Sequence, residues 1–293
     1  MLRIFTDTDT DMTPEMAKKY GYELISMPYT IDGKTTYPYK DKDFKTFDPK
    51  KFYDVLRKGV LPTTSALNAE EYKAYFEPVF KKGDDILYVH FSAAMSGTFN
   101  SMNLALEELK EKYPERKFYE IDTKGITLGS LNIVLEVGDL YKQGKSVEEI
   151  LAWADKEVDK FAIYFYADDL KFFAKSGRVG GLKAVMGNLM GIRPIIYMGE
   201  DGKMTNIGSC RGEKAVLKKL VDYARDLQED INKHRVIIGH TDALDNAQKL
   251  GELLKEEFGK DLEIEYYPVN PTAGSHCGPN CVGVSFHAKR RSL

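Results

Sequence analysis

The stretch Phe91–Met102, FSAAMSGTFNSM, joins a strand-like segment to a helix-like one. The residues that lead into it, Asp85–Phe91, form an apolar run that predicts a buried strand of a parallel sheet. Beyond it, apolar side chains recur at helical spacing from Met102 to Leu109, which predicts a helix over 97–111. A strand that passes through a short turn into a helix is the repeating unit of α/β proteins.

The turn between that strand and that helix carries groups that suit an anion. Backbone N–H groups are free at a helix N-terminus, and they attract negative charge. Ser96 and Thr98 add hydroxyls, and Gly97 lets a ligand approach the backbone closely. We therefore predict that this turn holds the negatively charged head of a ligand. The alternative is a helix capped by Ser or Thr with nothing bound.

Strands and helices alternate over the first 160 residues, which predicts a parallel sheet covered on both faces. Glu23–Ile31 is expected to form one strand, and Asn68 with Glu71 and Ser146 with Glu149 have the spacing of helix capping boxes. The pattern changes near residue 160, and a second α/β segment with a hairpin follows. We predict two α/β domains, 1–160 and 161–293, with the segment 273–288 packing back on the first.

The composition excludes several classes of protein. The chain has 293 residues, a net charge of −3 and a pI of about 6.0, without a basic face, which argues against nucleic acid as a partner. No run of eighteen apolar residues occurs, so no integral membrane segment is expected. Three cysteines do not make a disulfide framework, which predicts a reducing, cytoplasmic environment.

Polar side chains gather at two further places in the first half of the chain. Asp7, Asp9 and Asp11 follow the first strand, where carboxylates can bind a metal or cap the next helix. Thr63, Thr64 and Ser65 lie together just before a helix. Because Asn68 is expected to cap that helix, these three hydroxyls stay available to a ligand.

Two stretches of the second half offer further ligand contacts. Arg178 lies among three glycines, where a guanidinium suits a carboxylate or a phosphate, or is a solvated arginine in a turn. Ala184–Ile192 is apolar and holds two methionines, which predicts either plain core or a surface that adapts to a flexible ligand tail.

His276 is the histidine expected to be functional, because residues 273–281 predict a tight loop of small residues that a ligand could reach. The other four histidines lie in or beside predicted strands and are expected to be structural. Cys277 and Cys281 complete an H-C-x3-C pattern, which is not the C-x2-C spacing of common zinc sites. No metal is therefore expected, and the role of the two cysteines stays open.

A serine hydrolase is the alternative function. Ser96 and His276 could form a nucleophile–base pair in an esterase. The sequence around Ser96 lacks the first glycine of the G-x-S-x-G elbow and has Thr98 in place of the last. Glycine-rich nucleotide-binding motifs are also absent from the sequence. Clustered hydroxyls with one histidine and one arginine suit binding better than turnover.

Ordered motifs run along essentially the whole chain. They are Phe5-Thr6-Asp7-Thr8, Pro62-Thr63-Thr64-Ser65, Ser92–Thr98, Asp168–Arg178, Arg193-Pro194, Asp201-Gly202, Arg211-Gly212 and Gly274–Pro279. Together they resemble the motifs of the DegV family, bacterial fatty-acid-binding proteins. This sequence departs from the family pattern at Ala66-Leu67-Asn68, at Ala93-Ala94 and at Asn280, where glycine is usual.

The resemblance implies a two-domain α/β fold with a long-chain fatty acid in a tunnel between the domains. Its carboxylate would be met by residues matching Thr64, Ser96 and His276, to which we add Ser65, Gly97 and Thr98. Thr63 and Arg178 are expected to line the site. In relatives from firmicutes the protein presents the fatty acid to a separate ATP-dependent kinase subunit, and Arg211 matches an arginine that docks it. The chain is thus expected to be a carrier without catalytic residues, cofactor or metal.

Overall fold

Four parallel strands form the sheet of the N-terminal half, as the alternating pattern predicts. The computed structural model describes residues 1–181 and 191–292. Its first sheet has the order β2-β1-β6-β7. The strands are β1 (Leu2–Asp7), β2 (Tyr22–Ile25), β6 (Asp85–His90) and β7 (Phe118–Asp122). The short 3-10 helices η1 (Thr8–Thr10) and η2 (Ala93–Met95) follow the carboxyl ends of β1 and β6, where ligands bind in open α/β sheets.

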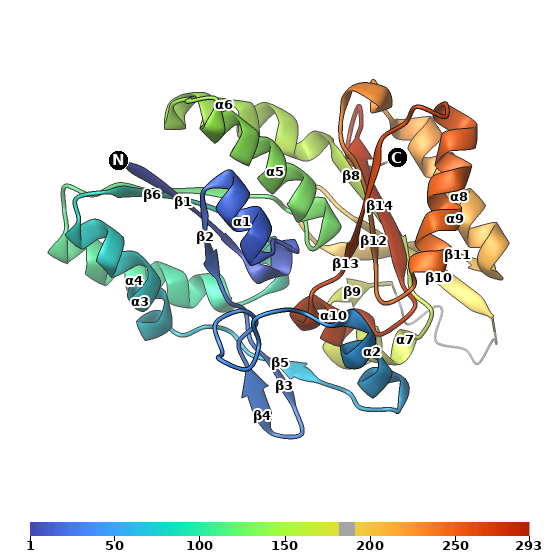
Figure 1. Cartoon of the computed structure of the whole chain (residues 1–293), viewed down its shortest axis with the longest axis horizontal. Coiled ribbons are helices and arrows are strands. Elements are labelled where there is room, and N and C mark those ends of the chain that lie inside the picture. The colour runs from blue at the N-terminus through green and yellow to red at the C-terminus, as the bar shows by residue number, and fades with distance from the viewer. Residues whose placement is uncertain (182–190, 293) are drawn as a thin grey trace.

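Helices cover both faces of this sheet. α3 and α4 pack against one face, and α1 and α5 against the other (Figure 1). The helices of this half are α1 (Pro14–Tyr20), α2 (Pro49–Arg57), α3 (Ala69–Lys81), α4 (Thr98–Lys112), α5 (Leu128–Lys142) and α6 (Val147–Glu157), with the 3-10 helix η3 (Val158–Lys160). Both predicted capping boxes are present. The side chains of Asn68 and Ser146 accept from the backbone N–H groups of Glu71 and Glu149, and each glutamate side chain accepts from the backbone N–H of its cap residue.

The expected strand over 23–31 is wrong as one element. It divides into β2 of the parallel sheet and β3 (Tyr29–Ile31), which joins a small antiparallel sheet with β4 (Lys34–Thr36) and β5 (Thr63–Thr64) in the order β4-β3-β5. The break falls at Met27-Pro28, where the Met27 N–H donates to Thr8 Oγ1 at 2.9 Å instead of to a neighbouring strand. The ladder with β1 has already ended at Ile25, and the Ser26 N–H donates to the Tyr75 hydroxyl at 3.2 Å.

All seven strands of the largest sheet come from residues after 160. They follow the order β13-β12-β14-β8-β10-β11-β9 and mix parallel with antiparallel pairs. They are β8 (Phe161–Tyr166), β9 (Val179–Gly180), β10 (Ile192–Met198), β11 (Met204–Arg211), β12 (Val236–His240), β13 (Ile264–Pro268) and β14 (Val282–His287). The accompanying helices are α7 (Leu170–Ser176), α8 (Glu213–Leu227), η5 (Ile231–Lys233), α9 (Leu244–Phe258) and α10 (Pro271–Cys277). Most of the methionine-bearing stretch 184–192 lies outside the described residues.

α5 joins the two halves because it packs against both large sheets (Figure 1). It meets β6 on one side and β8, β12 and β14 on the other, while α8 and α9 cover the opposite face of the seven-stranded sheet. Gly129 allows this close approach, since a Cβ there would stand 2.1 Å from Ile163 Cδ1. The N-terminus of α5 therefore lies directly against the second sheet.

The expected loop at 273–281 is wrong, because its first part forms the helix α10. Asn270 caps this helix by accepting from the Ala273 N–H at 2.9 Å, and Pro271 occupies its first turn. The small residues serve close packing, since a Cβ at Gly274 would meet the Tyr53 hydroxyl at 2.3 Å. α10 contacts β3, β5 and η1 of the N-terminal half, whereas β14 lies inside the seven-stranded sheet.

Candidate functional site

Residues from distant parts of the chain surround a hollow, which we call the polar pocket. β5 and the residues after it supply one wall, the turn between η2 and α4 a second, and α10 a third. Its lining consists of Asp9, Met27, Thr64, Ser65, Ala66, Phe91, Met95, Ser96, Gly97, Thr98, Ile126, Arg178, Thr272, Ala273 and His276. All six residues assigned to ligand binding from the sequence are thus brought together, and Arg178 with them.

One hydrogen bond joins the two ends of the chain in this pocket. Thr64 Oγ1 and His276 Nε2 lie 2.8 Å apart. Burial, together with the nearby positive charges of Arg178 and Lys175, lowers the pKa of His276 to about 4. At neutral pH the imidazole is therefore uncharged, with one donor and one acceptor nitrogen.

The turn before α4 offers the hydroxyl of Ser96 to a ligand. Ser96 Oγ accepts from the Thr98 N–H at 3.2 Å, so its own hydrogen is free to point elsewhere. The Thr98 hydroxyl is already engaged, because it accepts from the Leu67 N–H at 3.1 Å and pairs with the Tyr72 hydroxyl at 2.9 Å. Thr98 lines the pocket but mainly holds the segment after β5 in place.

Arg178 supplies a positive charge in the wall of the polar pocket. Its Nη1 donates to the Ser176 carbonyl at 2.9 Å and its Nε to the Met95 carbonyl at 3.4 Å. These two contacts hold the guanidinium beside Met95 and leave further N–H groups for an anion.

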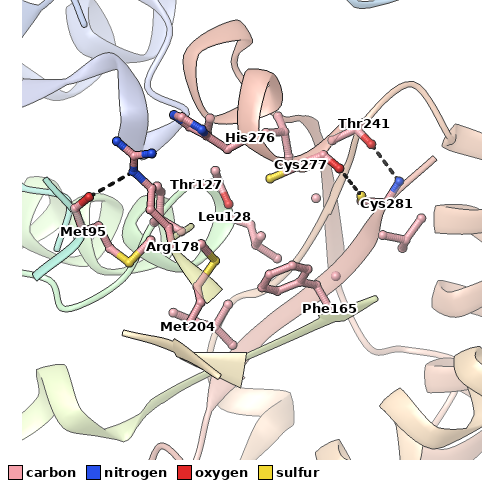
Figure 2. Close-up of a pocket in the computed structure, with 17 residues that line it drawn as sticks. Met95, Thr127, Leu128, Phe165, Arg178, Met204, Thr241, His276, Cys277 and Cys281 are labelled. Atoms are coloured by element: carbon pink, nitrogen blue, oxygen red, sulfur yellow. Dashed lines mark hydrogen bonds between the residues drawn. The ribbon is translucent and has the colours of Figure 1, made fainter. Parts of the chain in front are cut away.

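A second hollow adjoins the first, and we call it the apolar pocket. The two share five residues, which are Met95, Ile126, Arg178, Ala273 and His276. The rest of its lining consists of Thr127, Leu128, Ile163, Phe165, Met204, Gly239, Thr241, Val269, Cys277, Cys281, Val282 and Gly283. Figure 2 shows Arg178 and His276 at one end, with Phe165 on the far side among aliphatic side chains and sulfur atoms.

The acidic loop, residues 7–11 around η1, braces this site, a role that the sequence did not reveal. Asp7 Oδ2 accepts from the Tyr88 hydroxyl at 3.0 Å and the Phe91 N–H at 3.2 Å, which steadies the strand leading to η2. Asp11 Oδ1 accepts from Asn270 through both its backbone N–H and its side chain, each at 2.8 Å, which steadies α10. Burial raises the pKa of Asp7 and of Asp11 to about 7, although these hydrogen bonds oppose the shift.

Asp9, between those two carboxyls, faces the polar pocket. Only 7% of the residue is exposed, and its Oδ1 has no hydrogen-bond partner. Burial raises the pKa of Asp9 well above its usual value, and the charges of Asp7 and Asp11 add to the effect. The helix-cap interpretation of the acidic loop applies to Asp7, which caps η1, whereas Asp9 belongs to the pocket.

The cysteines are free thiols, and the structure offers no metal centre among residues 1–181 and 191–292. Cys277 and Cys281 both line the apolar pocket, where the Cys281 thiol donates to the Cys277 carbonyl at 3.3 Å. Burial raises the pKa of both thiols, that of Cys281 to about 12, so neither is an activated nucleophile.

Two residues singled out from the sequence lie away from both pockets. Thr63 is exposed and lines neither of them; its strand pairs with β3, opposite Thr30. Arg211 is exposed at the end of β11 and also lines neither pocket.

No helix in the described part of the chain is long and apolar enough to cross a membrane.

The family model described as an uncharacterised protein of the DegV family matches residues 1–289. This chain belongs to the DegV family. A DegV domain-containing protein of Clostridium perfringens is 34% identical over 97% of this chain and 96% of its own length. Another, from Clostridium acetobutylicum, is 26% identical over 99% of this chain and 98% of its own.

Solved DegV structures share the fold along the whole chain. The fatty acid binding DegV protein of Streptococcus agalactiae matches with a TM-score of 0.83 at 25% identity, covering 99% of each chain. A DegV protein from Eubacterium eligens, solved loaded with heptadecanoic acid, matches with a TM-score of 0.82 at 22% identity, covering 99% of this chain and 100% of its own. The two-domain DegV fold expected from the sequence is thereby confirmed.

Proposed function

We propose that this protein binds a long-chain fatty acid between its N-terminal part, 1–160, and its C-terminal part, 161–293. The carboxylate would lie in the polar pocket and the acyl chain in the apolar pocket. The observation that carries the proposal is that a polar and an apolar hollow lie side by side and share five lining residues, which suits one ligand with a polar head and an apolar tail. The Streptococcus agalactiae and Eubacterium eligens proteins support it, since both are described with fatty acids.

The energetics favour a ligand of this kind. Burying an acyl chain contributes about 0.8 kcal/mol for each methylene, so a long chain supplies on the order of 10 kcal/mol before the costs of association. A carboxylate loses hydration in the polar pocket and needs donors in return. Ser96, His276 and Arg178 can provide them, and the free N–H groups at the start of α4 lie beside Ser96.

We further propose that the protein is a carrier that presents the carboxylate to a separate ATP-dependent kinase. The polar pocket reaches the surface, since Ser65, Ala66 and Gly97 in its wall are exposed. A partner could therefore reach the carboxylate of the ligand while its acyl chain stays buried. Arg211, exposed and outside both pockets, is free to serve as the docking residue. The three free thiols suit the reducing cytoplasm in which such a kinase would work.

The geometry does not favour an esterase that uses Ser96 and His276. Nε2 of His276 is paired with Thr64, and the ring makes no hydrogen bond to a carboxylate in the described residues. A serine nucleophile needs a histidine base that is itself held by an orienting group. We therefore keep the carrier as the function and treat hydrolysis as an outcome to be tested.

The test is to identify what the purified protein holds and binds. Mass spectrometry of an organic extract of the denatured protein should reveal fatty acids, and the delipidated protein should bind hexadecanoic acid again in calorimetry. Hexadecanoic acid that binds no better than butanoic acid would contradict the proposal. Sustained release of acid from nitrophenyl acyl esters would replace it with the esterase.

A further inference from the structure

Asp9 is a polar group for which the fold provides no partner. It is 7% exposed and lines the polar pocket, yet its Oδ1 makes no hydrogen bond. A buried oxygen left in this way costs stability unless something else satisfies it. Its neighbours Asp7 and Asp11 each accept hydrogen bonds from the protein and line no part of the polar pocket, whereas the Asp9 side chain accepts none from the described residues and lies in the wall of the space where we propose that the ligand head binds.

The surroundings of Asp9 determine the form in which it can meet a carboxylate. On its own loop it faces the carboxyls of Asp7 and Asp11. The charge of Asp9 also acts on three other ionisable groups, which are the phenols of Tyr72 in α3 and Tyr88 in β6 and the Cys277 thiol in α10. Among the described residues, Arg178 is the positive charge that acts on Asp9, and His276, which also lines the pocket, is neutral. Two carboxylates with one arginine would repel each other in a buried site, so one of them needs a proton.

We propose that Asp9 binds the fatty acid as a neutral carboxylic acid, donating its O–H to the carboxylate of the ligand. This inference rests on the proposed function and adds a residue to its binding site. The ligand enters as an anion, Asp9 keeps its proton, and no covalent bond is made or broken. Arg178, which also lines the polar pocket, then balances the single negative charge that the pair carries.

A proton linkage follows from this arrangement. The bound anion holds the proton on Asp9, so the complex forms without proton uptake only while free Asp9 is already protonated. Above the pKa of free Asp9, each binding event takes up one proton, and affinity falls by up to about tenfold for each pH unit. His276 does not produce this slope, because its pKa of about 4 lies below the range concerned.

The experiment measures the affinity for hexadecanoic acid from about pH 6 to about pH 9 by calorimetry, in two buffers of different ionisation enthalpy. The wild type should lose affinity with rising pH and take up close to one proton at the alkaline end. Asp9→Asn keeps a donor but cannot ionise, so its affinity should not fall with pH. Asp9→Ala should weaken binding near neutral pH by about threefold to tenfold, the value of one lost hydrogen bond.

Asp11→Asn is the matched control. Asp11 lies in the same loop, is similarly buried and also has one unpartnered oxygen, Oδ2, but it does not line the polar pocket. This variant should keep the wild-type slope whatever its affinity.

The outcomes separate this inference from the proposed function. Tight binding by the wild type with no proton uptake, matched by equally tight binding of Asp9→Ala, would overturn the role of Asp9 and leave the fatty-acid carrier standing. Tighter binding by Asp9→Ala than by the wild type would also overturn it, since Asp9 would then be an ionised group that repels the ligand. Failure of the wild type to bind any fatty acid would overturn both. The proton count on the wild type needs no variant and holds even where a substitution prevents folding.

Discussion

Removing one hydroxyl from the polar pocket should matter far less than shortening the acyl chain. In Ser96→Ala the ligand loses one neutral donor, while the Thr98 N–H that Ser96 now accepts at 3.2 Å is freed to face the anion. The net loss should be about 0.5–1.5 kcal/mol, or roughly threefold to tenfold in affinity. A chain shorter by four methylenes loses about 3 kcal/mol of burial, or roughly a hundredfold, because the apolar pocket offers almost no polar surface to compensate.

The assay is displacement of a fluorescent fatty acid by saturated acids of graded length from the wild type, Ser96→Ala and His276→Ala. Ser101→Ala is the matched control, because Ser101 lies in α4, the helix that follows Ser96, but lines neither pocket. It should bind every chain as the wild type does. If chain length has no effect while either pocket substitution abolishes binding, the ligand is a small anion and the reasoning from the apolar pocket fails.

Three further predictions concern the partner, the chemistry and the stability. Arg211→Ala should bind hexadecanoic acid normally but slow the formation of acyl phosphate by a fatty acid kinase; lost lipid binding in a folded variant would refute the assignment. The wild type should not sustain hydrolysis of nitrophenyl acyl esters, and sustained hydrolysis that disappears in Ser96→Ala would contradict this. The pKa of Asp11 is about 7 in the folded protein and about 3.9 unfolded, so the folded state keeps a proton that the unfolded state releases. That contribution to stability is complete at acid pH and is lost as pH rises to about 7. Denaturant unfolding at about pH 5 and about pH 8 should therefore show a smaller fall for Asp11→Asn than for the wild type, and equal falls would contradict the shift.

The parts of the fold that depend on local patterns could be predicted from the sequence. The parallel strands β1, β6 and β7, the capping boxes at Asn68 and Ser146, and the turn at Ser96 all rest on residues close together in the chain. The nature of 271–277 could not be predicted in this way, because its small residues are typical of a loop. They form a helix instead, packed so closely against α2 that Gly274 has no room for a side chain beside Tyr53.

Asn280 shows how a departure from the family pattern is accommodated. Its φ of +65° lies in the left-handed region, which explains why glycine is usual there and why asparagine is tolerated. The side chain adds contacts that glycine cannot make, since its Oδ1 accepts from Arg57 Nη2 at 3.0 Å and its Nδ2 donates to Asp168 at 3.2 Å. The substitution therefore joins α2 to the loop after β8 and lies outside both pockets.

The polar pocket could be only partly predicted, because contacts between the two ends of the chain set its geometry. Thr64 meets His276, Tyr53 donates to the Val269 carbonyl at 2.9 Å, and Asp11 accepts from Asn270; each pair is more than 200 residues apart. No pattern in a single stretch reports such pairs. It was possible to name Thr64, Ser96 and His276 as candidates, but not to see that Asp9 lies among them.

Because different residues hold the polar pocket together and line it, a substitution can impair binding in two ways. Asp11, Tyr53 and Asn270 hold α10 against the N-terminal half without lining the polar pocket, so their loss should lower stability and affinity together. Ser96 and Arg178 line the pocket from turns that other contacts hold, so their loss should lower affinity at nearly constant stability. Asp9 should differ from both groups. Its unpartnered oxygen contributes no hydrogen bond to the free protein, so replacing it should stabilise that state while weakening the complex. Opposite signs for stability and affinity are the mark of a group placed for its ligand rather than for the fold.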